Sequence, residues 1–354
     1  MKIIQLLPTV SYGDAVSNYA FEIEKVIKSM ELDTEIYAEI SEKNVPVKNV
    51  SEMHISENDV LIYHMSTGSE LNFRIDNFPC RKIMIHHNIT PPEFFRPYNH
   101  ELFALTSYGY TGLEHLNSTF NLCIADSEYN KNQLIEYGYK CNIKVCPVLI
   151  NFSKYKSVPD ISVMKRYSDN FTNIIFVGRI APNKKHEDII KTFYFYKKIN
   201  PKARLILVGS WNGTEIYYER LKKYVETLGI DDVIFTGHVK FSEIISYYRI
   251  ADVFLCMSRH EGFCVPLLES MFFNVPVIAV NAGAVPETLG NSGILLPDSD
   301  PIRTAGIIHK IVTNQNLRRN IVRSQRIRLR DFSYGKTSGI LKNLLTNFLK
   351  GEYT

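Results

Sequence analysis

Short apolar segments alternate with helix-patterned segments along almost the whole chain. Of all the features of the sequence, this alternation restricts the available folds most. Strands that are separated by helices in this way build βαβ units, in which the strands pair in parallel and helices cover both faces of the sheet. With 354 residues, the chain is long enough for two such domains, each with its own core. We therefore predict an α/β fold made of two successive doubly wound sheets.

The predicted strands fall into two series, separated by a polar, proline-containing stretch at 151–172 that we interpret as an interdomain linker. The predicted strands are 2–7, 34–38, 59–63, 82–86, 121–126 and 143–149, followed by 173–178, 204–208, 232–236, 252–256, 276–280 and 293–296. The clearest helical stretches are 15–30, 98–116, 185–198, 214–228, 241–250 and 265–273. We expect domains at 1–155 and 156–332, with ligands beyond the carboxyl ends of the strands.

Charge is distributed unevenly between the two halves. Residues 1–160 hold 14 Lys and Arg against 20 Asp and Glu, whereas the remainder holds 27 against 17. A basic half suits an anionic ligand such as a nucleotide diphosphate, or an anionic membrane surface, although ordinary surface charge explains the same imbalance. The arginines between 318 and 330 lie in a helical stretch, which we interpret either as a charged outer face or as a surface for membrane contact.

The sequence also bears on compartment and on metal binding. No stretch approaches the roughly 20 consecutive apolar residues that span a bilayer. Residues 1–8 lack a basic leader and a small-residue cleavage site, so we expect a strand there and not a signal peptide. None of the six cysteines belongs to a CxxC pair, so we expect reduced, mostly buried thiols and no metal site. We expect a cytoplasmic protein, either free or peripheral at the inner membrane face.

The most informative segment is 258–271, which follows an apolar strand and opens a helix. Pro266 suits a first helical position, because the N–H that proline lacks would have no intrahelical partner there. The free amides of residues 263–265 would then face an anion at the helix N-terminus. Glu261 and Glu269 flank this point, so one carboxylate can contact a donor sugar and the other a nucleotide ribose. The alternative is an acidic helix start with a cap.

A second segment, 176–185, again runs from a strand through a glycine and a basic loop into a helix. It is not a Walker loop, because the GxxxxGK[ST] pattern is absent. Its basic residues include Arg179 and Lys184, which taken alone could be no more than a solvated loop. Ligands of such sheets lie beyond the carboxyl ends of the strands, so a loop that directly follows a strand, as this one does, is a candidate for ligand contact.

Residues 258–271 resemble the donor-binding motif of the retaining GT-B enzymes of glycosyltransferase family 4, whose hallmark is two glutamates separated by seven residues. The resemblance covers nearly the whole chain. It implies two Rossmann-like domains that face a cleft, and a terminal helix at 333–354 that crosses back onto the first domain. One position departs from the family, because Cys264 stands where the relatives usually have glycine. A Cβ beside the phosphates would narrow the loop's allowed geometry.

The resemblance implies how the donor is held. Arg179 and Lys184 match the Arg and Lys that clamp the diphosphate in the family, where their charges would stabilise the leaving phosphate without a metal ion. Val239 is the candidate for holding the base through backbone groups. The implied donor-binding residues are Gly13, Arg179, Lys184, Gly209, Val239, Glu261, Gly262, Phe263, Cys264, Val265 and Glu269. Of these, Glu261 is also a predicted catalytic residue.

The first domain should supply the acceptor side. His86 and His87 follow the fourth strand, where family members often place a histidine near the reaction centre. His86 is the better match and is predicted to be catalytic, and His87 is an acceptor candidate. The pair could also be plain loop histidines or metal ligands, but no carboxylate or cysteine stands at ligand spacing. Asp14 and Ser127 should either contact the acceptor or cap the helices that follow them.

The implied reaction is transfer of a hexose, of mannose or glucose type, from a GDP- or UDP-linked donor to a glycan or lipid-linked glycan. Retention would follow from front-face attack, in which catalysis is positioning plus electrostatic stabilisation. We expect no cofactor and no nucleic-acid partner. The alternative from a different class is a non-catalytic protein that binds a sugar or a nucleotide. An epimerase, a phosphorylase and a dinucleotide oxidoreductase are less favoured, the last because neither first turn carries GxGxxG.

Overall fold

A computed structural model describes residues 1–353, and the chain divides into two compact units. Unit 1 comprises Met1–Glu93, Glu101–Asn151 and the C-terminal segment from Phe332, and unit 2 comprises Phe94–His100 and Phe152–Asp331. Each unit contains one parallel sheet. Within residues 1–353, no helix is long and apolar enough to cross a bilayer.

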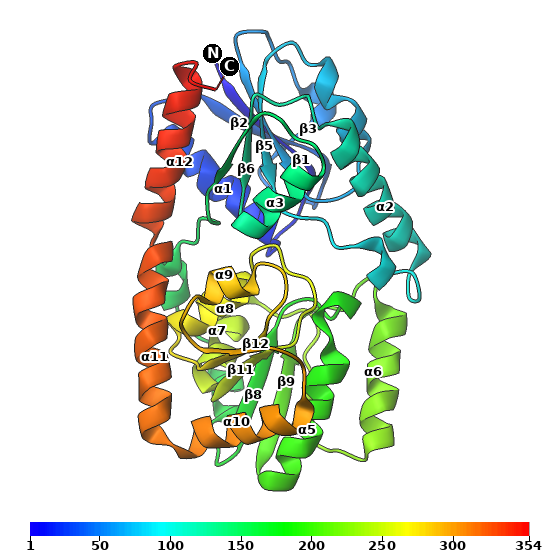
Figure 1. Ribbon diagram of the computed structural model, residues 1–354, viewed down its shortest axis with the longest axis vertical. Coiled ribbons are helices and arrows are strands. Elements are labelled where there is room, and N and C mark those ends of the chain that lie inside the picture. The colour runs from blue at the N-terminus through cyan, green and yellow to red at the C-terminus, as the bar shows by residue number, and fades with distance from the viewer. Residues whose placement is uncertain (354) are drawn as a thin grey trace. The chain divides into compact units, whose positions relative to one another are not determined.

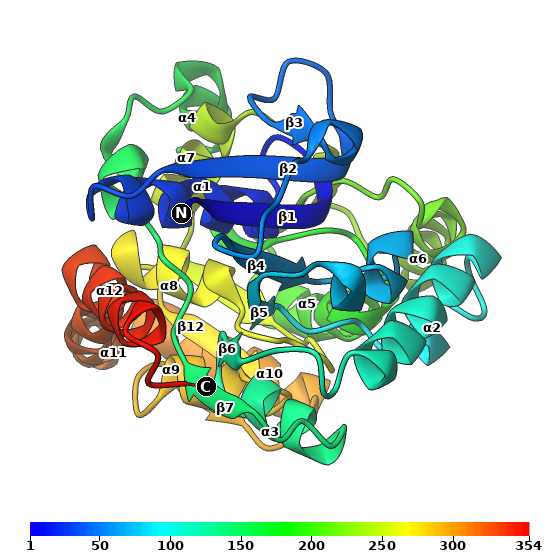
Figure 2. The ribbon, with the colours of Figure 1, turned by 90° about the horizontal axis from the view of Figure 1, so that it is seen from above.

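Unit 1 is built on a seven-stranded sheet with the order β3-β2-β1-β4-β5-β6-β7, in which all neighbours pair in parallel. Figure 2 shows these strands in that order from top to bottom. The strands are β1 (Ile3–Val10), β2 (Thr34–Ser41), β3 (Lys48–Asn49), β4 (Val60–Met65), β5 (Arg81–His86), β6 (Leu122–Ala125) and β7 (Asn142–Val145). The helices are α1 (Ala15–Lys28), α2 (His100–His115), α3 (Glu128–Glu136) and α12 (Tyr334–Leu349), the last of which packs against α1.

The central strands of unit 1 are apolar on both faces, as parallel strands covered by helices must be. In β1, Ile4 and Leu6 point into one buried cluster together with Tyr63, whereas Leu7 points into another with Ala20 of α1. Successive side chains of a strand alternate between the two faces of the sheet. A continuous apolar run therefore fills both layers of the core at once.

Unit 2 is built on a six-stranded parallel sheet with the order β10-β9-β8-β11-β12-β13. The strands are β8 (Thr172–Val177), β9 (Ala203–Val208), β10 (Val233–Phe235), β11 (Val253–Cys256), β12 (Val277–Val280) and β13 (Ile294–Leu296). The helices are α4 (Ile161–Tyr167), α5 (His186–Ile199), α6 (Glu215–Leu228), α7 (Phe241–Ile250), α8 (Val265–Phe272), α9 (Val285–Leu289), α10 (Pro301–Thr313) and α11 (Gln315–Leu329). Helix α5 packs against α6 and α10, whereas α7 packs against α4, and α8 against α11 (Figure 1).

The strand order determines where each unit can bind a ligand. In unit 2 the chain progresses outward from β8 to β10 and then returns to place β11 on the other side of β8. Open α/β sheets bind ligands beyond the carboxyl ends of the strands at such a switch point, so the loops after β8 and β11 are the candidate binding loops. The corresponding point in unit 1 lies between β1 and β4.

The structure adds two elements to the sequence analysis. The stretch 151–172, interpreted as an interdomain linker, begins at the boundary between the two units and contains a 3-10 helix, Phe152–Lys156, and the helix α4. Asp160 caps α4 by accepting from the backbone amides of Ser162 and Val163, and α7 packs against it. The short exposed strand β3 was not predicted. The other twelve strands lie where they were expected, with ends that differ by up to four residues.

Candidate functional site

Two loops that follow the neighbouring strands β8 and β11 carry most of the predicted donor residues. The backbone joins these loops directly. The amide of Arg259 donates to the carbonyl oxygen of Asn183 at 2.8 Å, and the Asn183 side chain donates to the carbonyl oxygen of His260 at 3.4 Å. Both strands end at the same edge of the sheet because they are parallel. The switch point thus places Lys184 of one loop beside Glu261 of the other.

Lys184 and Glu261 form an ion pair. Lys184 Nζ lies 2.8 Å from each carboxylate oxygen of Glu261, and the two side chains are 21% and 9% exposed. Burial lowers the pKa of Lys184, but the charge of Glu261 helps to raise it by more, so the pKa lies above its usual 10.5. The amine therefore stays protonated at neutral pH, and the loop pair presents one fixed cation next to one fixed carboxylate.

Arg179 is the exposed cation at the same edge. It follows Gly178 after β8, and its Nη2 donates to the carbonyl oxygen of Asn212 at 2.8 Å. Asn212 belongs to the loop after β9, which lies on the opposite side of β8 from β11. Within the loop after β8, Arg179 thus contacts the loop after β9, and Lys184 contacts the loop after β11.

Cys264 has a backbone conformation that is uncommon for a residue with a side chain. Its φ is +72° and its ψ +65°, in the left-handed region that glycine adopts most readily. Cys264 is the N-cap of α8, which begins at Val265, so Pro266 occupies the second helical position and not the first as predicted. The second helical position is still one whose N–H would have no intrahelical partner, so proline loses no helical hydrogen bond there. The loop thus keeps a glycine-like geometry while it carries a buried thiol.

Glu269 lies in α8 and is held by two tyrosines. The Tyr155 hydroxyl donates to Oε1 at 2.5 Å, and the Tyr248 hydroxyl donates to Oε2 at 2.6 Å. Burial raises the pKa of Glu269, and the two hydroxyl donors reverse part of that shift. The sequence analysis missed both tyrosines, because they lie 114 and 21 residues from Glu269 and no local spacing connects them.

Gly209 and Val239 lie on neighbouring loops at the β9–β10 side of the sheet. Gly209 has a φ of +151°, and a Cβ on it would lie 2.0 Å from the carbonyl oxygen of Gly178. An isolated antiparallel bridge pairs Gly209 with Gly237, so the segment that contains Val239 runs beside the loop after β9. Gly209 is therefore required for the close approach of the loops that follow β8 and β9.

The sequence analysis also missed how the segment after β12 supports Glu261. The amide of Ala284 donates to the carbonyl oxygen of Glu261 at 2.9 Å. Gly283 has a φ of +54°, and a Cβ on it would lie 2.4 Å from that same oxygen. The backbone of Glu261 is therefore fixed from the β12 side, and its side chain is fixed by Lys184.

Unit 1 contains a buried chain of hydrogen bonds that includes His87. Gln5 Nε2 donates to the carbonyl oxygen of Ala20 at 3.1 Å, so its Oε1, 3.0 Å from His64 Nε2, must accept a proton from that ring. Burial and the charge of His87 lower the pKa of His64 well below 6.5, which keeps its Nδ1 an acceptor. His87 Nε2 therefore donates to His64 Nδ1 at 2.9 Å, while His87 Nδ1 faces Asp126 Oδ2 at 2.9 Å. The ring of His87 thus links His64 to Asp126.

The remaining predicted residues of unit 1 lie at or after the ends of three strands, with His86 at the end of β5, Gly13 and Asp14 after β1, and Ser127 after β6. His86 is fully buried, and its Nε2 lies 2.7 Å from Gln133 Oε1. Asp14 and Ser127 are the N-caps of α1 and α3, and each accepts from a backbone amide of its helix at 2.8 Å and 3.1 Å. The interpretation of both residues as helix caps is confirmed. Gly13 is exposed in a left-handed turn with a φ of +77°.

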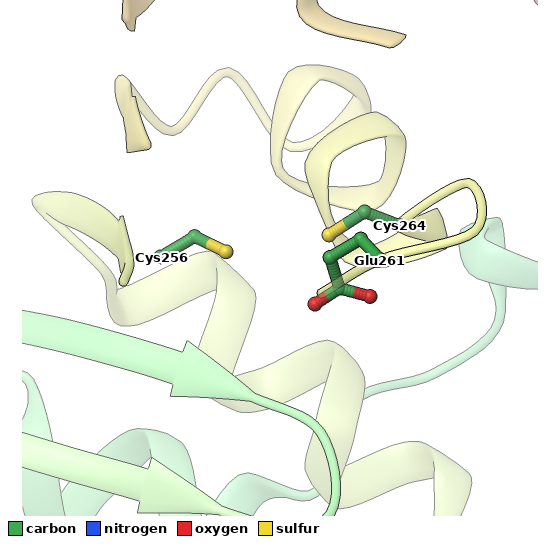
Figure 3. Close-up of side chains that lie close together, drawn as sticks. All are labelled: Cys256, Glu261 and Cys264. Atoms are coloured by element: carbon green, nitrogen blue, oxygen red, sulfur yellow. The ribbon is translucent and has the colours of Figure 1, made fainter. Parts of the chain in front are cut away.

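One group of possible metal ligands was not foreseen. Cys256, Glu261 and Cys264 are all buried, and one ligand atom from each lies within 4.8 Å of the others (Figure 3). Neither His86 nor His87 belongs to a group of three such residues within residues 1–353. All six cysteines are free thiols. Five of them are buried, so the expectation that most are buried is confirmed. The sequence offers no signal for this group, because the two cysteines come from a strand end and a helix start.

Comparison with known proteins gives a family match within the second part of the chain. Residues 165–328 match the family model described as glycosyl transferases group 1. A D-inositol 3-phosphate glycosyltransferase of Acidothermus cellulolyticus is 30% identical over 48% of this chain and 39% of its own length. An uncharacterized glycosyltransferase of Methanocaldococcus jannaschii, MJ1178, is 23% identical over 95% of this chain and 96% of its own length. The chain spans about half or less of the length of several curated relatives that it matches.

Solved structures share the fold of the whole chain. The likeness to Anabaena HepE in complex with UDP-glucose has a TM-score of 0.78 at 17% identity, and covers 98% of this chain and 100% of that one. Sucrose-phosphate synthase of Thermosynechococcus elongatus gives 0.77 at 15% identity, over 99% and 100% of the two chains. The predicted GT-B fold, with its two parallel α/β sheets, is confirmed.

Proposed function

The chain belongs to the group 1 glycosyl transferases, and we propose that it transfers a hexose from a nucleotide diphosphate sugar to a glycan or lipid-linked glycan. We further propose that the anomeric configuration is retained and that no metal ion is required. The observation that carries the proposal is the pairing of Lys184 with Glu261 at the switch point of unit 2, with the tyrosine-held Glu269 in the helix α8 that follows the Glu261 loop.

In this proposal the diphosphate spans the end of β8. Arg179 approaches it from the β9 side and Lys184 from the β11 side, while the free amides at the start of α8 supply neutral donors. Cations and amides that are already fixed in place stabilise the charge of a leaving phosphate without reorganisation. This arrangement supports catalysis without a metal ion, because two side-chain charges oppose the charge of the diphosphate.

The two glutamates divide the rest of the donor between them. An ionised carboxylate has two acceptor oxygens. Glu261 can therefore keep one oxygen on Lys184 and accept a hydrogen bond from a sugar hydroxyl with the other. Glu269 would accept the ribose hydroxyls, with Tyr155 and Tyr248 holding its carboxylate in one orientation. HepE is described in complex with UDP-glucose, so UDP-glucose is the first donor to test, beside GDP-linked hexoses.

We propose that the acceptor binds at the loops of unit 1 that carry Asp14, His86, His87 and Ser127. The hydrogen bonds of His86 with Gln133 and of His87 with His64 and Asp126 would have to rearrange for either ring to bond a substrate. His86→Asn and His87→Asn variants separate the candidates. The variant of the histidine at the reaction centre should lower kcat at an unchanged donor dissociation constant.

Calorimetric titration with UDP, GDP, ADP and their hexose conjugates, with and without EDTA, tests the donor proposal. We expect one nucleotide diphosphate to bind selectively, to be indifferent to EDTA, and to lose its affinity in Lys184→Ala and Glu269→Ala. Lys191→Ala is the matched control, since Lys191 is an exposed lysine of α5 in the same unit. Absence of binding by all nucleotides would contradict the proposal. Binding without transfer to any acceptor would favour the non-catalytic alternative.

We also infer that α11 carries a surface for an anionic membrane. Helix α11 contains five arginines and no Asp or Glu. A groove of about 660 Å³ lies along it and is lined by Asn274, Gln315, Arg318, Arg319, Val322, Arg323, Arg326, Ile327 and Arg330. Ile327 is 56% exposed among these cations. An apolar side chain surrounded by arginines suits the boundary between lipid headgroups and acyl chains.

Vesicle binding tests this surface. Each basic residue near an anionic bilayer contributes about 1 kcal/mol, so the double variant Arg323→Gln with Arg330→Gln should weaken binding to phosphatidylglycerol vesicles by about thirtyfold. The control Lys191→Gln with Lys223→Gln removes the same charge from exposed positions on α5 and α6. Binding that is equal for phosphatidylcholine vesicles, or that the control weakens as much, would contradict the inference.

A further inference from the structure

We propose that Cys256, Cys264 and Glu261 form a binding site for one thiophilic divalent metal ion of the zinc class, and that this ion excludes the donor. The proposal concerns regulation of the site described above, so its second half rests on the proposed function. Its first half, metal binding, stands on the geometry of three side chains and can be tested without any substrate.

The three ligands belong to one loop, the two cysteines at its ends and the glutamate between them. Cys256 ends β11, Cys264 caps α8, and Glu261 lies on the loop between them. Figure 3 shows the two thiol groups pointing toward each other, with the carboxylate of Glu261 beside Cys264. Their ligand atoms lie within 4.8 Å of one another. Two sulfurs on one tetrahedral zinc ion stand about 3.8 Å apart, given Zn–S bonds of about 2.3 Å, so the two sulfurs need to approach each other by no more than about 1 Å.

The donor set suits a soft ion. Two thiolates and one carboxylate leave a fourth tetrahedral position open, which is the pattern of accessible zinc sites. Thiolates select zinc and related ions against magnesium and calcium, which prefer oxygen ligands. Ser258 adds a second contact: its Oγ lies 3.3 Å from Cys256 Sγ and is fully buried. A hydroxyl in that position can donate to a ligating thiolate and hold it in place.

The neighbouring cation Lys184 does not prevent binding. With both thiols counted as protonated, the site before binding also holds one carboxylate and one ammonium group, and its net charge is zero. Binding forms two S–metal bonds and releases the two thiol protons to solvent. A dication with two thiolates again sums to zero, so the buried site gains no net charge. Glu261 can share its carboxylate, with one oxygen on Lys184 and the other on the ion.

The backbone conformation of Cys264 allows its thiol to be removed without disturbing the loop. Its left-handed φ of +72° is the conformation that glycine adopts without strain, so Cys264→Gly removes a ligand while keeping the loop. The chain also contains a control pair elsewhere. Cys141 Sγ lies 3.4 Å from Cys123 Sγ in unit 1, and this pair has no third ligand within residues 1–353. Cys141→Ser removes a thiol of a close pair without touching the proposed site.

Cadmium serves as the spectroscopic probe for metal binding. Titration of the full-length protein with Cd²⁺ should produce the ultraviolet thiolate-to-cadmium band at one ion per chain, with release of two protons per ion in weak buffer. The band should disappear in Cys264→Gly and Cys256→Ser and persist in Cys141→Ser. Fluorescence of Trp211 during urea unfolding checks that each variant is folded. Absence of the band, its persistence in folded Cys264→Gly, or its loss in Cys141→Ser would overturn the site.

Competition with the donor is the second measurement. At a zinc concentration about ten times its own dissociation constant, the apparent dissociation constant of the nucleotide diphosphate sugar should rise about tenfold, because the ion takes the Glu261 oxygen that the proposed function gives to the sugar hydroxyl. In Cys264→Gly the ratio of affinities with and without zinc should approach one. A cadmium band together with unchanged nucleotide affinity would refute the exclusion of the donor. Failure of all nucleotides to bind in the absence of metal would refute the proposed function, while the cadmium band would still decide the metal site.

Discussion

Replacing Lys184 by methionine removes the cation that faces Glu261 while keeping most of the side-chain volume. At 2.8 Å and an effective dielectric constant of about 20, Coulomb's law gives an attraction of about 6 kcal/mol. Desolvation of both groups offsets part of this attraction. Glu261 is 9% exposed and Lys184 21%, so the pair stands between a buried and a surface ion pair. We therefore expect Lys184→Met to lower the unfolding free energy of unit 2 by about 2–3 kcal/mol.

The assay uses the single tryptophan of the chain, Trp211, which lies in unit 2 and stacks on Tyr218 with ring centroids 4.0 Å apart. Its fluorescence reports urea unfolding of the unit that carries the ion pair. With an m-value of about 2 kcal/mol per molar urea, the expected loss lowers the midpoint by about 1–1.5 M. Lys191→Met is the matched control and should change the free energy by less than about 0.5 kcal/mol.

A double-mutant cycle with Glu261→Gln isolates the interaction between Lys184 and Glu261. The folded pKa of Lys184 lies above 10.5, so the stabilisation is complete below about pH 10.5 and is lost as the pH rises through the folded value. The difference between wild type and Lys184→Met should thus be constant from about pH 7 to pH 9 and shrink above about 10.5. A coupling energy below about 0.5 kcal/mol would refute the reasoning, because the pair would then behave as a solvent-screened contact.

Three further variants test other parts of the site. Tyr248→Phe removes a donor that lowers the pKa of Glu269, so the loss of nucleotide affinity on acidification should begin at a higher pH than in wild type. Nucleotide affinity that falls over the same pH range in both proteins would contradict this role. Gly209→Ala would force a Cβ to within 2.0 Å of the Gly178 carbonyl oxygen, and Trp211 fluorescence should show a loss of about 3 kcal/mol or more. Cys264→Gly relieves about 1 kcal/mol of backbone strain, but it loses a similar amount of stabilisation through the buried side chain and the greater entropy of the unfolded chain. Its unfolding free energy should therefore stay within about 1 kcal/mol of wild type. A loss above about 2 kcal/mol would show that the thiol packs more tightly than inferred.

Local patterns carried most of the fold prediction. An apolar run such as β4 is buried along its whole length, and the run itself predicts a strand. The structure departs from the prediction where the local pattern is weak. Helix α4 has seven residues in a polar stretch and owes its order to the Asp160 cap and to packing against α7. The strand β3 has two exposed residues and exists through its pairing with β2.

The same division applies to the candidate site. The sequence predicted that Lys184 and Glu261 belong to ligand-binding loops, because each follows a strand and precedes a helix. It did not predict that the two side chains bind each other, since they are 77 residues apart. Tyr155 and Tyr248 were invisible for the same reason. Cys256, Glu261 and Cys264 are close in sequence, but their approach depends on the course of the loop that joins β11 to α8.

The sequence by itself determined the α/β class, the two series of strands and the loops that carry charge, because these depend on residues a few positions apart. Only the tertiary structure decided which loops meet, because the strand order in each sheet depends on pairing between distant segments. The placement of β11 beside β8 brings Lys184 to Glu261 and leaves Arg179 facing the β9 loop. Hydrogen bonds and ion pairs require contact within about 3–4 Å, and folding alone brings distant residues within that range.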